Sequence, residues 1–209
     1  MPEVWAILLA AGESSRMGRL KALLPWRDTT LLEYQLHSLL EAGIQQVVVV
    51  LGHDADRLKP VVDSVDGASW AHNPDYLLGK TTSLKTGVAA LAGQKVSDVL
   101  LLNVDQPRSA DTVRTLLERH LASSYQITIP THGGRGGHPI LISATLLPEL
   151  AEIEEESQGL KAVVRRHAEA TERFELDDPA VLLDLNTPEQ YQNALDSANQ
   201  GVSEPRNSW

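Results

Sequence analysis

The residues with the clearest chemical meaning lie near the N-terminus, where an apolar run over residues 4–9 ends in small residues at positions 10–12. Two cations, Arg16 and Lys21, follow. Gly12 can adopt backbone angles that a side chain would forbid. Free backbone N–H groups in such a loop, together with the two cations, would bind an anion of high charge such as a triphosphate. The alternative is a strand, a loop and the solvated, basic start of a helix.

Two well-known phosphate-binding loops do not fit this spacing. A Walker A loop needs Gly, four residues and then Gly-Lys-Ser/Thr, which the stretch from Gly12 to Lys21 does not provide. The dinucleotide fingerprint needs three glycines spaced G-x-G-x-x-G, and Gly12 and Gly18 do not supply them. The stretch therefore predicts a nucleotide site that belongs neither to an ATPase nor to a dehydrogenase.

A carboxylate follows another strongly apolar stretch. Residues 99–104 end at Asp105, which precedes Gln106 and Pro107. Because ligands bind beyond the carboxyl ends of strands in an open parallel sheet, Asp105 and the first loop should face one crevice. A carboxylate beside phosphates is a hard oxygen ligand suited to Mg²⁺. The alternative is an ordinary helix cap or turn residue.

Strands alternate with helices along most of the chain, which predicts an α/β fold. Apolar runs mark the strands, and leucines at helical spacing over residues 31–40 mark the first long helix. This rhythm favours a doubly wound, mostly parallel sheet with helices on both faces. A helix should begin near residues 79–83, with Thr81, Thr82 or Ser83 as its cap. Another should begin at Pro188, with Thr187 as its cap. We expect one domain over residues 1–194 and a frayed polar tail over residues 195–209.

Composition limits the function classes. The 209 residues suffice for one sizeable core and are few for two. A net charge of −10 argues against nucleic acid or an anionic membrane as partner. Without cysteine there is no disulfide, thiolate metal site or cysteine nucleophile, and with no signal peptide or bilayer span we expect a cytoplasmic protein. An anionic substrate would need a local cluster of cations, namely Arg16, Arg19, Lys21 and Arg27.

Residues 9–21, LAAGESSRMGRLK, resemble the signature loop of the MobA-like nucleotidyltransferases, and among them most closely that of the molybdenum cofactor cytidylyltransferases. The resemblance implies a Rossmann-like fold in which Arg16 holds the outer phosphates and Lys21 the α-phosphate. The sugar-nucleotide branch usually has Gly-Thr-Arg and a proline before the lysine, where this chain has Ser15 and Leu20. The implied nucleotide-binding residues are Leu9, Ala10, Ala11, Gly12, Ser14, Arg16 and Lys21, with Gly79 and Ser83 from a second, base-reading segment. The cytidylyltransferases of the family pair Ala-Ala-Gly in the first loop with a serine-ended second segment, as this chain does, whereas the guanylyl branch has Ala-Gly-Gly.

The same resemblance implies a metal site and an acceptor site. Asp105 of the Asp-Gln-Pro motif and Asn186, just before Thr-Pro-Glu, would hold Mg²⁺, with Mn²⁺ as an alternative. Asp184 competes with Asn186, since two residues two positions apart on an extended segment point to the same side. The acceptor would meet His138, Arg135 and Lys161, although this chain carries one glycine more between Arg135 and His138 than the family motif.

The function implied by the resemblance is transfer of CMP from CTP to the phosphate of molybdopterin-bound molybdenum cofactor, with release of pyrophosphate. A phosphate monoester has a second pKa near ~6, so it can attack without a general base. A molybdenum hydroxylase is an expected partner. Three alternatives stay open: the same chemistry with GTP or a sugar phosphate, a pterin-cofactor carrier or chaperone for such a hydroxylase, and a degenerate nucleotide-binding module.

Overall fold

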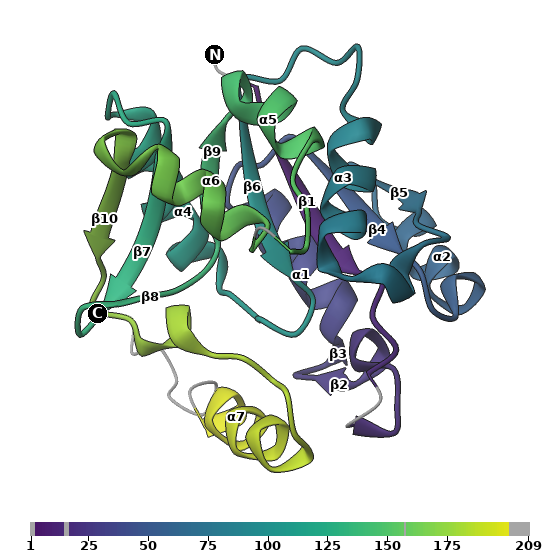
Figure 1. Ribbon diagram of the computed structural model, residues 1–209. Helices are drawn as coiled ribbons and strands as arrows, with labels where there is room; N and C mark the ends of the chain where they lie inside the picture. The colour runs from purple at the N-terminus through teal and green to yellow at the C-terminus, as the bar shows by residue number, and fades with distance from the viewer. Residues whose placement is uncertain (1–2, 15–16, 157, 201–209) are drawn as a thin grey trace.

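The computed structural model describes residues 3–14, 17–156 and 158–200, and its centre is a mostly parallel β-sheet (Figure 1). The strand order is β10-β7-β9-β6-β1-β4-β5, and the short β8 pairs with β7. Every pairing is parallel except those made by β8 and β9. The strands are β1 (Val4–Ala10), β4 (Gln46–Leu51), β5 (Ala68–His72), β6 (Asp98–Asn103), β7 (Ile127–His132), β8 (Arg135–Gly136), β9 (Ile140–Ser143) and β10 (Thr171–Glu175).

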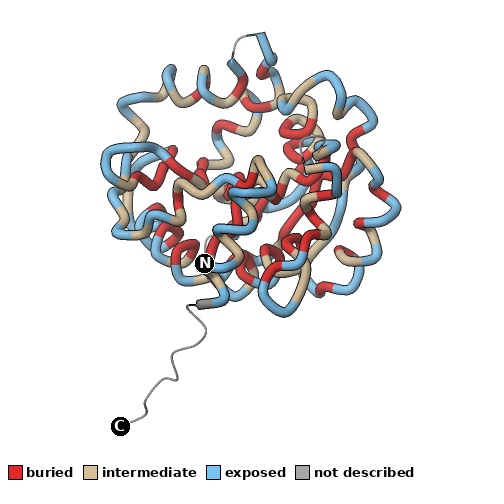
Figure 2. Tube along the Cα trace, turned by 90° about the horizontal axis from the view of Figure 1, so that it is seen from below, coloured by how far each residue is buried: buried red, intermediate tan, exposed pale blue. Residues whose placement is uncertain are grey.

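Helices cover both faces of the sheet, as the apolar strands predict. In β1, Ala6 and Leu8 pack into one apolar cluster, whereas Ile7 packs into another on the opposite face. Figure 2 shows the buried residues gathered inside and the exposed ones on the outer turns. One face carries α1 (Leu31–Glu41), α2 (Ala55–Asp63) and α4 (Ala110–Leu121), and the other carries α3 (Lys80–Ala90), α5 (Leu147–Ala151) and α6 (Leu160–Arg166). The predicted doubly wound α/β class is confirmed.

Strand β9 departs from the parallel pattern. It lies between β7 and β6 and runs antiparallel to both. The physical reason is the short connection after β7, because a parallel return requires a crossover of a dozen or more residues. Gly133 (φ 57°) and Gly134 (φ 75°) turn the chain back through β8 in the glycine-rich loop.

Two predicted helix caps have different outcomes. The predicted hydroxyl cap of α3 is wrong: Gly79 occupies the N-cap position, and no side chain caps the helix. The Thr82 hydroxyl instead donates to the Gly79 carbonyl oxygen at 2.8 Å. The predicted cap at Thr187 is confirmed, since the Thr187 hydroxyl accepts from the Gln190 amide at 3.2 Å.

The C-terminal part of the described chain packs beside the N-terminal hairpin of β2 (Pro25–Trp26) and β3 (Thr29–Thr30). Helix α7 (Pro188–Gln200) places Leu195 and Ala198 against the cluster around Trp26 and Leu31. Residue 194 therefore lies inside a helix, while residues 201–209 lie outside the described part, and the domain division stays a prediction. Short 3₁₀ turns complete the chain: η2 (Lys21–Leu23), η3 (Tyr76–Leu78), η4 (Ala144–Leu146), η5 (Ala168–Ala170) and η6 (Pro179–Leu182). No helix in the described residues is long and apolar enough to cross a bilayer.

Candidate active site

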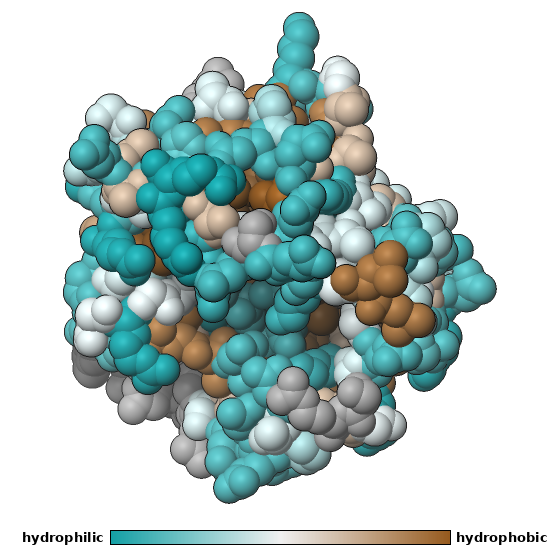
Figure 3. All heavy atoms as spheres, viewed as in Figure 1, coloured by the Kyte–Doolittle hydropathy of each residue, from teal (hydrophilic) through white to brown (hydrophobic). Residues whose placement is uncertain are grey.

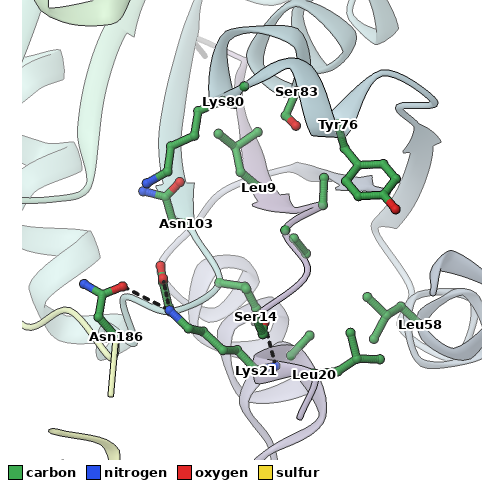
Figure 4. Close-up of a pocket in the computed structure, with 17 residues that line it drawn as sticks. Leu9, Ser14, Leu20, Lys21, Leu58, Tyr76, Lys80, Ser83, Asn103 and Asn186 are labelled. Carbon is green, nitrogen blue, oxygen red and sulfur yellow. Dashed lines mark hydrogen bonds and ion pairs between the residues drawn. The ribbon is translucent and has the colours of Figure 1, made fainter. Parts of the chain in front are cut away.

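A pocket of about 320 Å³ opens at the carboxyl ends of β1 and β6, where an open α/β sheet binds its ligands (Figure 4). Figure 3 shows a hollow near the centre of the molecule in the view of Figure 1, with many hydrophilic side chains around it. Most of the lining comes from four parts of the chain: the end of β1 with the loop that follows it, the start of α3, the end of β6 and the segment before α7. Leu58 of α2 and Tyr76 of η3 complete it. The lining residues are Leu9, Ala10, Ala11, Gly12, Ser14, Leu20, Lys21, Ala22, Leu58, Tyr76, Gly79, Lys80, Ser83, Asn103, Val104, Asp105 and Asn186.

Three polar side chains from distant parts of the chain meet in this pocket. The Lys21 ammonium lies 2.7 Å from Asp105 Oδ2 and donates to Asn186 Oδ1 at 3.0 Å. The Lys21 and Asp105 side chains are only 12% and 18% exposed. The Leu185 amide also donates to the Asp105 carbonyl oxygen at 2.9 Å, which fastens the segment of Asn186 to the end of β6. Asp184 is exposed and does not line the pocket.

The loop after β1 is shaped by Ser14 rather than by Gly12. Ser14 has φ 55°, and its hydroxyl oxygen accepts from the Lys21 amide at 3.1 Å. Gly12 is not in the left-handed region, and a Cβ there would meet nothing within 4 Å. The expectation that Gly12 is needed for its backbone angles is therefore wrong. The space beside it belongs to the pocket.

Asn73 hydrogen-bonds to the predicted base-reading segment around Gly79 and Ser83 from the protein interior. Asn73 is buried, and its side-chain amide donates to the hydroxyl oxygens of Ser83 and Thr82 at 2.9 Å each. Ser83 is buried and lines the pocket together with Gly79. Because the Ser83 oxygen accepts from Asn73 and its proton reaches no acceptor in the described residues, the hydroxyl is free to donate to a ligand.

The predicted cluster of cations is only partly correct. Arg16 lies outside the described residues. Arg19 and Arg27 are exposed and do not line the pocket. Arg27 sits at the β2–β3 turn with φ 54°, and its guanidinium lies over the Tyr34 ring at 5.4 Å. The pocket's other lysine is Lys80, which the sequence analysis did not select.

The three predicted acceptor residues lie outside the pocket lining. The Nδ1 atom of His138 is 3.2 Å from the side-chain amide nitrogen of Gln106. Burial, with the charges of Arg108 and Lys80, lowers the pKa of His138 to about 4, and Asp105 opposes this only weakly. The ring is thus neutral at pH 7, with its proton on Nε2, because Gln106 donates to Nδ1. Arg135 on β8 and Lys161 on α6 are exposed, and their roles stay predictions.

Comparisons with known proteins identify the family. The profile of the MobA-like NTP transferase domain matches residues 6–171. The chain belongs to this family. It is 28% identical to the molybdenum cofactor cytidylyltransferase of Escherichia coli K12 (91% of this chain, 95% of the relative) and 31% identical to the nicotine blue oxidoreductase of Paenarthrobacter nicotinovorans (93% and 98%). The crystal structure of Rv0371c from Mycobacterium tuberculosis H37Rv, in complex with manganese, superimposes with a TM-score of 0.74 (27% identity, 93% of this chain, 99% of that one).

Within this MobA-like fold, one buried arginine joins the parts of the site. Arg108 is 1% exposed, and all its hydrogen bonds go to backbone carbonyl oxygens: His138 at 2.7 Å, Pro107 and Val181 at 2.9 Å each, and Leu183 at 3.1 Å. Burial lowers its pKa to about 10, against the opposing influence of Asp178, Asp184 and Asp105, so it stays charged at pH 7. The sequence analysis missed Arg108, because an arginine after Asp-Gln-Pro carries no sign that it is buried.

Replacing Arg108 by methionine should lower the free energy of unfolding by about 2–4 kcal/mol, since several buried carbonyl groups lose a charged donor. Urea denaturation measures this. The control is Arg57→Met, which removes an exposed arginine whose ion pair with Asp54 spans 3.4 Å and should cost less than about 1 kcal/mol. Equal losses in the two variants would contradict the role of Arg108 as the link between these segments.

Proposed function

We propose that this protein transfers CMP from CTP to the phosphate of molybdopterin-bound molybdenum cofactor and releases pyrophosphate. The observation that supports this most strongly is the meeting of Lys21, Asp105 and Asn186 beside the loop after β1. The loop offers an anion site, the lysine offers a charge for the reacting phosphate, and the two oxygens offer ligands for a metal.

The donor set fits a divalent metal ion bound together with a nucleotide. Asp105 Oδ2 and Asn186 Oδ1 both face the point occupied by the Lys21 ammonium, so two hard oxygen atoms converge there. Mg²⁺ typically takes one or two protein oxygens and completes its shell with substrate phosphates and water. In the described residues no three His, Cys, Asp or Glu side chains form a metal site. With two protein oxygens available, the metal ion would bind together with the triphosphate. The manganese complex of Rv0371c supports a divalent metal ion, for which we propose Mg²⁺ or Mn²⁺.

The metal ion would supply charge neutralisation for the phosphates, and the chain's own residues would do the rest. Lys21 would move from Asp105 to the α-phosphate, where its positive charge would stabilise the phosphorus centre at which the new bond forms. Ser83 would donate a hydrogen bond to the base. Arg16 would hold the outer phosphates. No residue needs to act as a general base, because the attacking phosphate monoester is largely ionised at neutral pH.

The choice of CTP is supported by the loop Ala10-Ala11-Gly12, by Ser83, and by the likeness to the E. coli cytidylyltransferase. GTP as donor, or a sugar phosphate as acceptor, would use the same site. A carrier of the pterin cofactor for a molybdenum hydroxylase would need the acceptor side alone. The relative named as a nicotine blue oxidoreductase shows that family membership does not fix the reaction.

A nucleotide screen tests the proposal. Each of CTP, GTP, ATP and UTP is added with Mg²⁺, with Mn²⁺ or with EDTA, and the melting temperature is measured. At about 100 times its Kd, CTP with metal should raise Tm by about 5–10 °C, and EDTA should remove the shift. Pyrophosphate release should then require both CTP and molybdopterin cofactor.

A Lys21→Ala variant separates the enzyme from the carrier. If the protein is only a carrier, cofactor binding survives in the variant and the wild type shows no turnover. A wild-type protein whose Tm responds to none of the four nucleotides contradicts the proposed function.

A further inference from the structure

Lys80 is a second lysine in the pocket, and neither the loop after β1 nor the metal ligands account for it. It is the first residue of α3 and lines the pocket together with Asn103 and Asp105. In Figure 4 its side chain extends from the start of α3 toward Asn103, whereas Lys21 reaches Asp105 from the other end of the pocket. The two lysines thus approach the centre from different sides.

The two lysines also differ in what they bind. Lys21 is paired with Asp105 and Asn186. Lys80 makes no hydrogen bond or ion pair with any residue that the structure describes. The charge of Lys80 does act on Glu155, but that carboxylate accepts from the Thr81 amide at 3.0 Å and the Thr81 hydroxyl at 2.8 Å, and these two bonds lower the pKa of Glu155 more than Lys80 does. Lys80 is an exposed residue that lines the pocket and has no such partner, so in a protein of net charge −10 it is suited to an anionic ligand.

The charge of Lys80 also reaches His138, which lies outside the pocket lining. It is one of the charges that keep the His138 ring neutral. Gln106 joins the two regions, since its side chain accepts from the Asn103 side chain at 2.9 Å and contacts His138 at 3.2 Å. A ligand group held beside Lys80 and Asn103 would therefore find a full positive charge, with the Asp105–Lys21 pair on its other side.

We propose that Lys80 binds the attacking phosphate of the acceptor, a phosphate monoester, and holds it against the α-phosphate that Lys21 neutralises. This rests on the proposed nucleotidyl transfer and adds to it the residue that takes the second substrate. The dianionic phosphate of the acceptor and the negatively charged α-phosphate repel each other as they approach, and a cation on each side of the new bond offsets that repulsion.

The step needs no further reactant. An oxygen of the acceptor's phosphate dianion forms a bond to the α-phosphorus of the nucleotide. The bond from that phosphorus to the oxygen bridging the β-phosphate breaks, and its electron pair leaves with pyrophosphate. The product is a diphosphate diester, and no proton is transferred.

The test compares Lys80→Met, Lys80→Arg and Lys85→Met with the wild type. Lys85 is the matched control, because it lies on the same helix but lines a different hollow, with Ile153 and Glu154–Glu156. Calorimetry gives the Kd of CTP with Mg²⁺, and pyrophosphate release at saturating CTP gives the KM of molybdopterin cofactor. Lys80→Met should raise that KM by about 10- to 100-fold while the Kd of CTP changes less than about 2-fold. Lys80→Arg should restore part of the loss, and Lys85→Met should change neither value.

Each other outcome has a definite meaning. An equal loss of CTP affinity in Lys80→Met would make Lys80 a nucleotide contact and overturn the inference, as would an unchanged KM. Both leave the proposed function intact, because the wild type still turns over. A wild type that binds no CTP ends the proposed function, and this inference with it.

Discussion

Asp105→Asn is expected to reduce pyrophosphate release from CTP by about 10²- to 10³-fold. Asparagine keeps the shape of the side chain and one oxygen but loses the negative charge, so the metal ion would be left with two neutral amide oxygens. The stabilising effect of CTP with Mg²⁺ on Tm should shrink in the same variant. Unchanged turnover would contradict the assignment of Asp105 as a metal ligand.

A thermodynamic cycle separates this effect from damage to the fold. The Lys21 side chain is only 12% exposed, so Asp105→Asn leaves a largely buried ammonium without its counter-charge. Without ligand, the free energy of unfolding should fall by about 1–3 kcal/mol. Adding Lys21→Met should recover part of that stability, because no unpaired charge remains, yet turnover should stay absent. Turnover that returns with stability in the double variant would refute both catalytic assignments.

Gly12→Val is expected to raise the Kd of CTP by about 100-fold or more, while the protein folds normally. A side chain at Gly12 meets no protein atom within 4 Å at its Cβ and points into space that the nucleotide would need. Calorimetry with CTP and Mg²⁺ measures the loss, and thermal unfolding without ligand should show Tm within a few degrees of wild type. Gly12→Ala should give a smaller loss of affinity.

Gly52→Ala is the contrasting control. A Cβ at Gly52 would lie 2.7 Å from the Ala11 carbonyl oxygen and 2.8 Å from the Tyr76 ring, so this variant should lose stability. If Gly12→Val binds CTP as well as wild type, the nucleotide does not pass along the loop after β1, and the site must be placed elsewhere in the pocket.

The main features of the fold could be predicted from the sequence, because strands that are buried on both faces of a sheet appear in the sequence as unbroken apolar runs. Strands such as β4, with its unbroken run of valines, can only lie in the middle of a two-sided sheet. The antiparallel β9 could not be predicted in the same way, because its apolar residues look like those of a parallel strand. The α3 cap failed for a related reason: Thr82 satisfies its hydroxyl within the preceding turn instead of capping the helix.

The meeting of Lys21 and Asp105 was predictable for a geometric reason, since parallel strands end at one edge of the sheet. Arg19 and Arg27 show the limit of that argument. A residue close in sequence to the loop after β1 lies near the pocket, but the backbone turn that carries it determines whether its side chain enters the pocket. Arg27 instead lies over the Tyr34 ring. Lys80 was not selected from the sequence, because a lysine at a helix start is usually solvated. Only the structure shows that it lines the same pocket as the end of β6.

The hydrogen bond from the Leu185 amide to the Asp105 carbonyl oxygen affects the order in which the parts of the pocket come together during synthesis. During synthesis the residues of β1, η2 and β6 leave the ribosome long before Asn186 does, and N-terminal parts fold first. Strands β1, β4 and β6 and the loop after β1 can thus fold while Asn186 is not yet synthesised. Competence for chemistry would arrive in a single late event, when the segment before α7 docks on the end of β6.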